Sequence, residues 1–190
     1  MATVEQDWSW DSLYAAWREL DVPEGWHAEI TEEGITVTPP PTVQHTSVVE
    51  AVQTRLHAAV LPSVAVYQRL GLSFPHLRRL YEPDLVVIPR QALEGATYSV
   101  PAAAALLVVE VTSKSNARHD RTAKGWAYAH GRVPLYLLID PWDADGPATT
   151  LFAAPADGEY TNAERVAFGQ TVTLPAPFVV QVDTAKFPVP

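Results

Sequence analysis

The chain has 190 residues, of which 47% are hydrophobic and 18% charged, as expected for one globular domain with a substantial core. It contains no cysteine, which excludes disulfides, thiolate zinc sites and a cysteine nucleophile. The net charge of −9 argues against loose coating of DNA, because such binding depends on neutralising phosphates. Residues 112–139 reverse this balance, since Asp120 is their one acid among five basic residues.

The N-terminal third predicts a helix, a hairpin and a second helix. Apolar residues at spacings of three and four predict a helix over residues 9–21, capped by Asp7 or Ser9. Residues 25–39, "GWHAEITEEGITVTP", alternate on both sides of "EEG" and predict a hairpin. The next helix is expected from about 43 to 60 and ends before Pro62.

The middle of the chain predicts buried strands around one helix. Residues 64–74, 79–90, 104–113 and 133–141 are the expected strands, and the third is apolar enough to be central in a sheet. Residues 116–131 predict a helix that is capped by Ser115 or Asn116 and stops at Gly131. A strand–helix–strand unit indicates a parallel crossover, whereas the preceding strands indicate an antiparallel meander.

These elements predict an α/β (α+β) fold, with a mixed β-sheet flanked by helices. We expect one domain over residues 1–190, with a core at about 25–142 and a β-rich extension at about 143–190. The longest apolar run, "VPAAAALLVV", is too short to span a membrane, and the start of the chain is acidic. A soluble, cytoplasmic protein is therefore expected.

Two carboxylates are the main candidates for chemistry. Asp84 begins one predicted strand and Glu110 ends the next, so antiparallel pairing would bring them to the same rim of the sheet. Together with the main-chain carbonyl of Val111, they would offer the oxygen ligands that suit Mg²⁺ or Mn²⁺. Asp84 alone is better explained as a turn residue after Pro83. Glu110 is harder to explain structurally, because a carboxylate within an apolar strand needs a partner or an ion.

A lysine is expected near this rim, and two positions compete for the role. Lys124 lies on the predicted helix, four residues after Asp120, so these two side chains share one helix face. Lys114 has the same strand parity as Glu110 but lies beyond the predicted strand. We favour Lys124 and keep Lys114 as the second choice. If Lys124 has no role in chemistry, an exposed ion pair with Asp120 would explain its position on the helix.

Three stretches of the chain carry a family pattern: "PPPTVQHTSVVEAV", "YEPDLVVIP" and "LLVVEVTSKSNARHDRTAKGWAYAHGRVPLYLLIDP". They resemble the Uma-two family of restriction endonuclease-like proteins, within the PD-(D/E)xK nuclease superfamily. The resemblance covers about residues 25–142 and extends weakly into the C-terminal tail. It departs from the family pattern at Arg132, Leu135 and Leu137. The matching positions are His45, Pro83, Asp84, Glu110, Ser113, Ser115, Asp120, Lys124, Tyr128, Gly131, Val133, Pro134, Asp140 and Pro141.

This resemblance implies a Mg²⁺- or Mn²⁺-dependent endonuclease that hydrolyses nucleic acid, with DNA as the expected substrate. Asp84 and Glu110 would bind the ion, Lys124 would act on water, and Asp120 would position the lysine. A homodimer is one arrangement that would cut both strands. The rival interpretation is a nuclease-like interaction module that no longer cleaves. The expected substrate-binding residues are His45, Lys114, Arg118 and Arg121.

Overall fold

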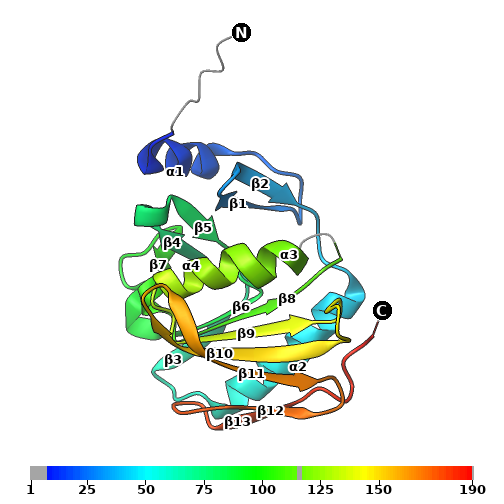
Figure 1. The fold of residues 1–190 in the computed structure, drawn as a ribbon. Coiled ribbons are helices and arrows are strands. Elements are labelled where there is room, and N and C mark those ends of the chain that lie inside the picture. Colours follow the sequence, from blue (N-terminus) through cyan, green and yellow to red (C-terminus); the bar gives the residue numbers. More distant parts are fainter. Residues whose placement is uncertain (1–7, 115–116, 190) are drawn as a thin grey trace.

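The computed structural model describes residues 8–114 and 117–189 of the chain. Figure 1 shows a smaller sheet and a larger sheet, with a helical segment between them and a second helix against the far side of the larger sheet. The helices are α1 (Trp10–Glu19), α2 (Val43–Ala59), α3 (Ala117–His119), the π-helical turn η4 (Asp120–Lys124) and α4 (Gly125–His130). Short 3-10 turns are η1 (Pro75–Leu77), η2 (Arg90–Leu93) and η3 (Ala102–Ala104).

The smaller sheet has the strand order β2-β1-β5-β4-β7. Its central pairs are antiparallel, and β4 pairs with β7 in parallel. The expected hairpin forms its outer edge, where Thr31 faces Gly34 across the turn and Gly34 has a φ of 110°, which suits glycine. The strands are β1 (His27–Thr31), β2 (Gly34–Thr38), β4 (Gly71–Phe74), β5 (Arg79–Tyr81) and β7 (Ser99–Pro101).

The larger sheet has the strand order β11-β10-β9-β8-β6-β3 and is mixed. Its one parallel pair joins β8 to β9 through the segment α3–η4–α4, which confirms the expected crossover. The remaining pairs are antiparallel. The strands are β3 (Val64–Tyr67), β6 (Leu85–Pro89), β8 (Leu107–Val111), β9 (Leu135–Asp140), β10 (Ala148–Ala156) and β11 (Glu159–Ala167).

Successive side chains along the strands of the larger sheet point to opposite faces, and each face packs into its own hydrophobic core. On one face, the buried stripe of α2 packs with Leu107, Val109 and residues of the C-terminal segment. On the other face, Val108 packs with Tyr128 of α4 and with Phe74 of the smaller sheet. The segment α3–η4–α4 therefore lies between the two sheets, as Figure 1 shows.

The C-terminal segment extends the same fold. Strands β10 and β11 widen the larger sheet, while β12 (Thr171–Leu174) and β13 (Val180–Asp183) form a separate antiparallel pair. Val172 and Val182 join the core under α2. Within the two ranges that the structure describes, no helix has both the length and the apolar character needed to cross a membrane.

The α+β class and mixed sheet are confirmed, but two expected strands are each divided. Residues 64–74 form β3 and β4, which belong to different sheets, because Arg69 takes a left-handed conformation with a φ of 52°. Residues 79–90 likewise divide at Pro83 into β5 and β6. Ser9 caps α1, whereas Asp7, Ser115 and Asn116 lie outside the described residues. The smaller sheet as a separate layer was not predicted.

Candidate active site

The register of two neighbouring strands brings Asp84 and Glu110 together. Strands β6 and β8 are antiparallel, and Leu85 lies opposite Val109. Continuing this register by one residue places Asp84 opposite Glu110, and both line a cavity of about 520 Å³. The backbone N–H of Val111 donates a 2.7 Å hydrogen bond to Oδ2 of Asp84, which fixes this carboxylate at the strand end.

Lys124 lies beside Glu110 and is surrounded by three carboxylates. Its Nζ is 2.9 Å from Oε1 of Glu110, 3.0 Å from Oε1 of Glu29 and 3.7 Å from Oδ1 of Asp120. The lysine is only 4% exposed, but it lines the same cavity as Asp84 and Glu110. The sequence-predicted lysine therefore projects into the cavity and does not form an exposed ion pair.

The local helix geometry explains how both members of the Asp120–Lys124 pair are buried. These residues bound a π-helical turn, and the Tyr136 hydroxyl donates a 3.0 Å hydrogen bond to the backbone carbonyl of Asp120. Gly125 follows directly, and a Cβ at this position would come within 3.4 Å of the Tyr136 ring. π-Turns inside α-helices are frequent at functional sites. Here the turn packs closely on β9 and directs Lys124 toward β8.

Burial and charge shift the pKa values of this cluster in defined directions. Burial raises the pKa of Glu110 well above its usual range, although the Lys124 ammonium acts in the opposite direction. For Lys124, burial lowers the pKa, but Glu110, Glu29 and Asp120 outweigh it and raise the pKa. Tyr128 donates a 2.6 Å hydrogen bond to Oε1 of Glu110, and burial raises the pKa of this hydroxyl. Lys124 is therefore charged and Tyr128 protonated at neutral pH.

Asp120 is the least well satisfied carboxyl of the cluster. It is 1% exposed, and neither of its oxygens has a hydrogen-bond partner among the residues that the structure describes. Burial raises its pKa to about 7, and the Lys124 charge offsets only part of this effect. The side chain thus lies behind the lysine and does not line the cavity. Its position suits a residue that orients Lys124 and never touches a ligand.

The free energy of unfolding of Asp120→Asn, measured relative to that of the wild type, is expected to be higher at pH 8 than at pH 5. The folded-state pKa of about 7 lies above the ordinary value of 3.8, so ionising Asp120 costs stability as the pH rises between these values. Asparagine does not ionise, so the variant escapes a cost on the order of a few kcal/mol. Urea unfolding at several pH values measures the difference. If the free energy of unfolding changes with pH in the same way in both proteins, the raised pKa of buried Asp120 is contradicted.

His45 contacts the opposite side of Asp84. Its Nε2 lies 3.1 Å from Oδ2 of Asp84, at the start of α2, where Thr42 caps the helix. Burial lowers the pKa of His45, but the hydrogen bond and charge of Asp84, with a further bond to the Val111 backbone, raise it above its usual value. The predicted ligand-contacting histidine is therefore held against the two groups proposed as metal ligands.

The structure does not bring the predicted arginines into the cavity. The guanidinium of Arg121 forms an ion pair with Asp140 and donates to the Trp142 carbonyl, so its hydrogen-bonding capacity is largely used. Arg118 is exposed on the helix and is not among the lining residues. The phosphate contacts expected of these two residues are thus not supported at this site. Lys114, exposed beyond the end of β8, does line the cavity.

The sequence did not indicate the roles of two residues in the cluster. Glu29 of β1 accepts hydrogen bonds from Lys124 and from the Glu82 backbone N–H at 2.7 Å. The hairpin alternation gave no sign that this glutamate is buried. Tyr128 matched the family pattern without a role, and its spacing of four residues from Lys124 was the available signal. Glu82 also lines the cavity, and burial next to Glu29 raises its pKa to about 7.

The donor atoms of the site fit a hard divalent cation held partly by water. Oδ1 of Asp84 and Oε2 of Glu110 have no hydrogen-bond partner among residues 8–114 and 117–189, and both residues line the cavity. Across the described part of the chain, no cluster of three or more His, Cys, Asp or Glu side chains could hold a metal ion. Mg²⁺ is commonly bound through one or two carboxylates and several waters, which matches this smaller donor set.

Comparison with solved structures first places the chain in a fold class. It is similar to a crystal structure from Anabaena variabilis ATCC 29413 described as "a putative nuclease belonging to DUF820". The TM-score is 0.67 and the identity 16%, over 90% of this chain and 91% of that one. At this identity, the likeness establishes a shared fold.

The sequence also matches a family profile over residues 12–185, and its description is "Putative restriction endonuclease". The protein belongs to this Uma2 family, as the sequence motifs predicted. The match includes most of α1 and most of the C-terminal β-rich segment, so it extends beyond residues 25–142 in both directions. Comparison with curated proteins gave no match.

Proposed function

We propose that the protein is a metal-dependent nuclease that hydrolyses phosphodiester bonds in nucleic acid, with DNA as its substrate. One observation carries the proposal: Lys124 lies 2.9 Å from Glu110 in the cavity that Asp84 also lines. Two strand-end carboxylates and a buried ammonium group are the components needed to stabilise charge on a phosphate and to orient a water molecule. Membership of a family whose description is "Putative restriction endonuclease" supports the same chemistry.

Each residue has a role that follows from its position. Asp84, Glu110 and the Val111 carbonyl would hold Mg²⁺ or Mn²⁺, which, when bound, polarises a phosphate oxygen and lowers the pKa of a coordinated water. Lys124 would orient the attacking water and stabilise negative charge on the phosphate. Asp120 and Glu29 would position Lys124, and Tyr128 would orient Glu110 through its hydrogen bond.

Cleavage assays test the activity directly. The protein is incubated with single-stranded, duplex and branched DNA and with RNA, in Mg²⁺ and in Mn²⁺, and the products are resolved by electrophoresis. Metal-dependent products that disappear on chelation are the expected result. Failure to cleave any of these substrates, in protein shown to bind the metal, would favour a nuclease-like interaction module over an enzyme.

Millimolar Mg²⁺ or Mn²⁺ is expected to raise the melting temperature. An ion that binds the folded protein alone adds about 2.7 kcal/mol when its concentration is 100 times the dissociation constant. For a chain of this size, that corresponds to a shift of roughly 5–10 °C, which scanning fluorimetry resolves. Asp84→Asn should lose most of the shift, and sodium chloride at equal ionic strength should not reproduce it. An equal shift in the variant would place the ion elsewhere.

A further inference from the structure

Trp142 is an aromatic residue at the cavity whose main chain is held by hydrogen bonds. It lines the cavity and is 39% exposed. Its backbone N–H donates a 3.0 Å hydrogen bond to Oδ1 of Asp140, and its carbonyl accepts a 2.6 Å bond from Arg121. Thr112 donates a 2.7 Å hydrogen bond to the same oxygen of Asp140. The main chain beneath the indole is therefore fixed on both sides, whereas the ring itself remains accessible.

A cation accompanies this ring. The Nζ of Lys114 lies 5.8 Å from the centre of the Trp142 ring, within the range of a cation–π contact. Lys114 is exposed and lines the same cavity. An aromatic ring with an ammonium group near it offers the two kinds of contact that a nucleotide makes, because bases stack on aromatic rings and phosphates bind cations.

The other walls of the cavity are rich in apolar side chains. A proline segment, residues 39–41, lines it between β2 and α2, and Pro188 and Val189 line it near the end of the chain. The volume of about 520 Å³ lies within the range of pockets that take small molecules and cofactors, ~300–1,000 Å³. Duplex DNA presents charged backbone and hides its bases. Such a surface gains little from apolar walls on a protein of net charge −9.

We propose that the cavity takes an unpaired nucleotide of a nucleic acid strand, with its base stacked on Trp142 and its phosphate beside Lys114, toward Asp84 and Glu110. The substrate class is therefore a single strand, an end or a displaced base, and an intact duplex is excluded. The position of the phosphate rests on the nuclease function proposed above. The stacking site rests on Trp142, Lys114 and the apolar walls alone.

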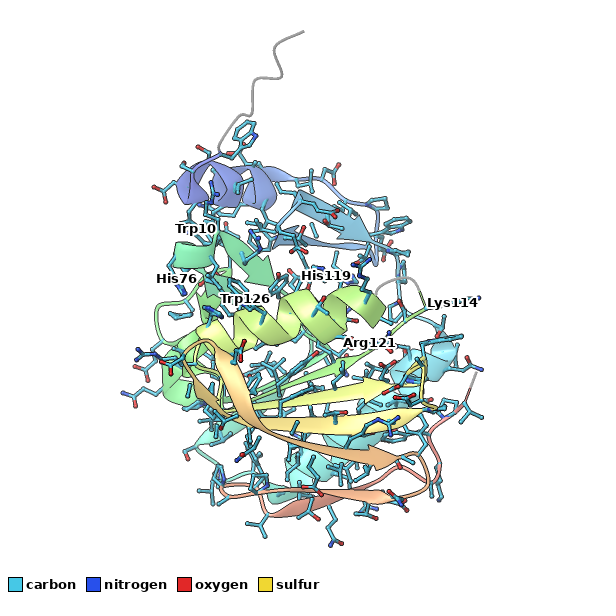
Figure 2. All side chains as sticks on the ribbon, viewed as in Figure 1. Trp10, His76, Lys114, His119, Arg121 and Trp126 are labelled. Atoms are coloured by element: carbon cyan, nitrogen blue, oxygen red, sulfur yellow. The ribbon has the colours of Figure 1, made fainter. Side chains whose placement is uncertain are left out.

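The test measures binding separately from cleavage. Fluorescence anisotropy of labelled single-stranded and duplex oligonucleotides is recorded with protein in EDTA, where metal-dependent cleavage is absent. Trp142→Ala is expected to weaken single-strand binding by about tenfold, and Trp142→Phe should restore most of it. Trp126→Ala is the matched control, because this tryptophan is 47% exposed and lies outside the cavity, on α4 and well away from Lys114 in Figure 2.

The outcomes separate the stacking site from the nuclease function. Single-strand binding that Trp142→Ala leaves unchanged, or duplex binding that is equally tight, would overturn the stacking site. If single-strand binding depends on Trp142 but no metal condition gives cleavage, the stacking site is supported and the nuclease function is rejected. A third outcome is cleavage that requires Glu110 but keeps its preference for single strands over duplex in Trp142→Ala. That outcome would support the nuclease function and reject the stacking site.

Discussion

Glu110→Gln is expected to lower the rate of metal-dependent cleavage by on the order of 10²–10³-fold while the fold is retained. The substitution preserves side-chain size and leaves an oxygen that accepts the hydrogen bond from Tyr128. It removes the negative charge that a divalent ion needs at the end of β8. Lewis-acid stabilisation by a metal is worth several kcal/mol in the transition state, which corresponds to this loss of rate.

The retained fold follows from the remaining partners of Lys124. Glu29 and Asp120 still pair with its ammonium group, so no buried charge is left uncompensated. Circular dichroism and thermal melts check the fold, and single-turnover cleavage with Mg²⁺ and Mn²⁺ measures the rate. Glu164→Gln, at an exposed position of β11, is the matched control and should cleave normally. A Glu110→Gln protein that cleaves at the wild-type rate would reject the proposed mechanism.

Lys124→Met is expected to destabilise the protein by about 3–5 kcal/mol at pH 7, the typical cost of breaking a buried ion pair. Methionine fills the space of the lysine stem but leaves Glu29, Glu110 and Asp120 without their shared cation. Without the lysine charge, burial raises the pKa values of Glu110 and Asp120 further above their unfolded values. Because groups with raised pKa values favour the folded state when protonated, the deficit should shrink as the pH falls from 7 to 5.

Denaturant unfolding followed by tryptophan fluorescence measures this deficit at both pH values. Lys114→Met is the control, because an exposed lysine typically changes stability by less than about 0.5 kcal/mol. Adding Glu29→Gln to Lys124→Met should recover part of the lost stability, since one unpaired carboxylate is removed. A deficit that is equal at pH 5 and pH 7 would show that lost packing, and not lost charge pairing, explains the effect.

The parts of the site that were predictable have local causes. Glu110 interrupts an apolar strand, so its burial and its need for a partner follow from its immediate neighbours. Its approach to Asp84 follows from antiparallel pairing of consecutive buried strands, which the register confirms. Lys124 is four residues from Asp120, and the expected shared helix face persists through the π-turn.

The parts that were missed depend on distant contacts. Glu29 and Lys124 are separated by 95 residues, and no local pattern connects them. Arg121 lies in a basic stretch that suggests phosphate binding, but its guanidinium forms an ion pair with Asp140 on β9. The division of residues 64–74 between two sheets depends on the left-handed conformation of Arg69, whose backbone N–H is bonded to the Pro83 carbonyl. Residue type and alternation do not encode such a change of direction.

The proposed reaction centre lies where three layers of the fold meet, because Lys124 forms ion pairs with carboxylates of both sheets. Glu29 belongs to the smaller sheet, Glu110 to the larger sheet, and the lysine to the helical segment between them. No layer carries the complete constellation by itself. A chain whose smaller sheet has not yet docked therefore lacks one of the carboxylates that hold the lysine in place. In the proposed nuclease, Lys124 would therefore be held by its full set of carboxylates only after both sheets have packed against the helical segment.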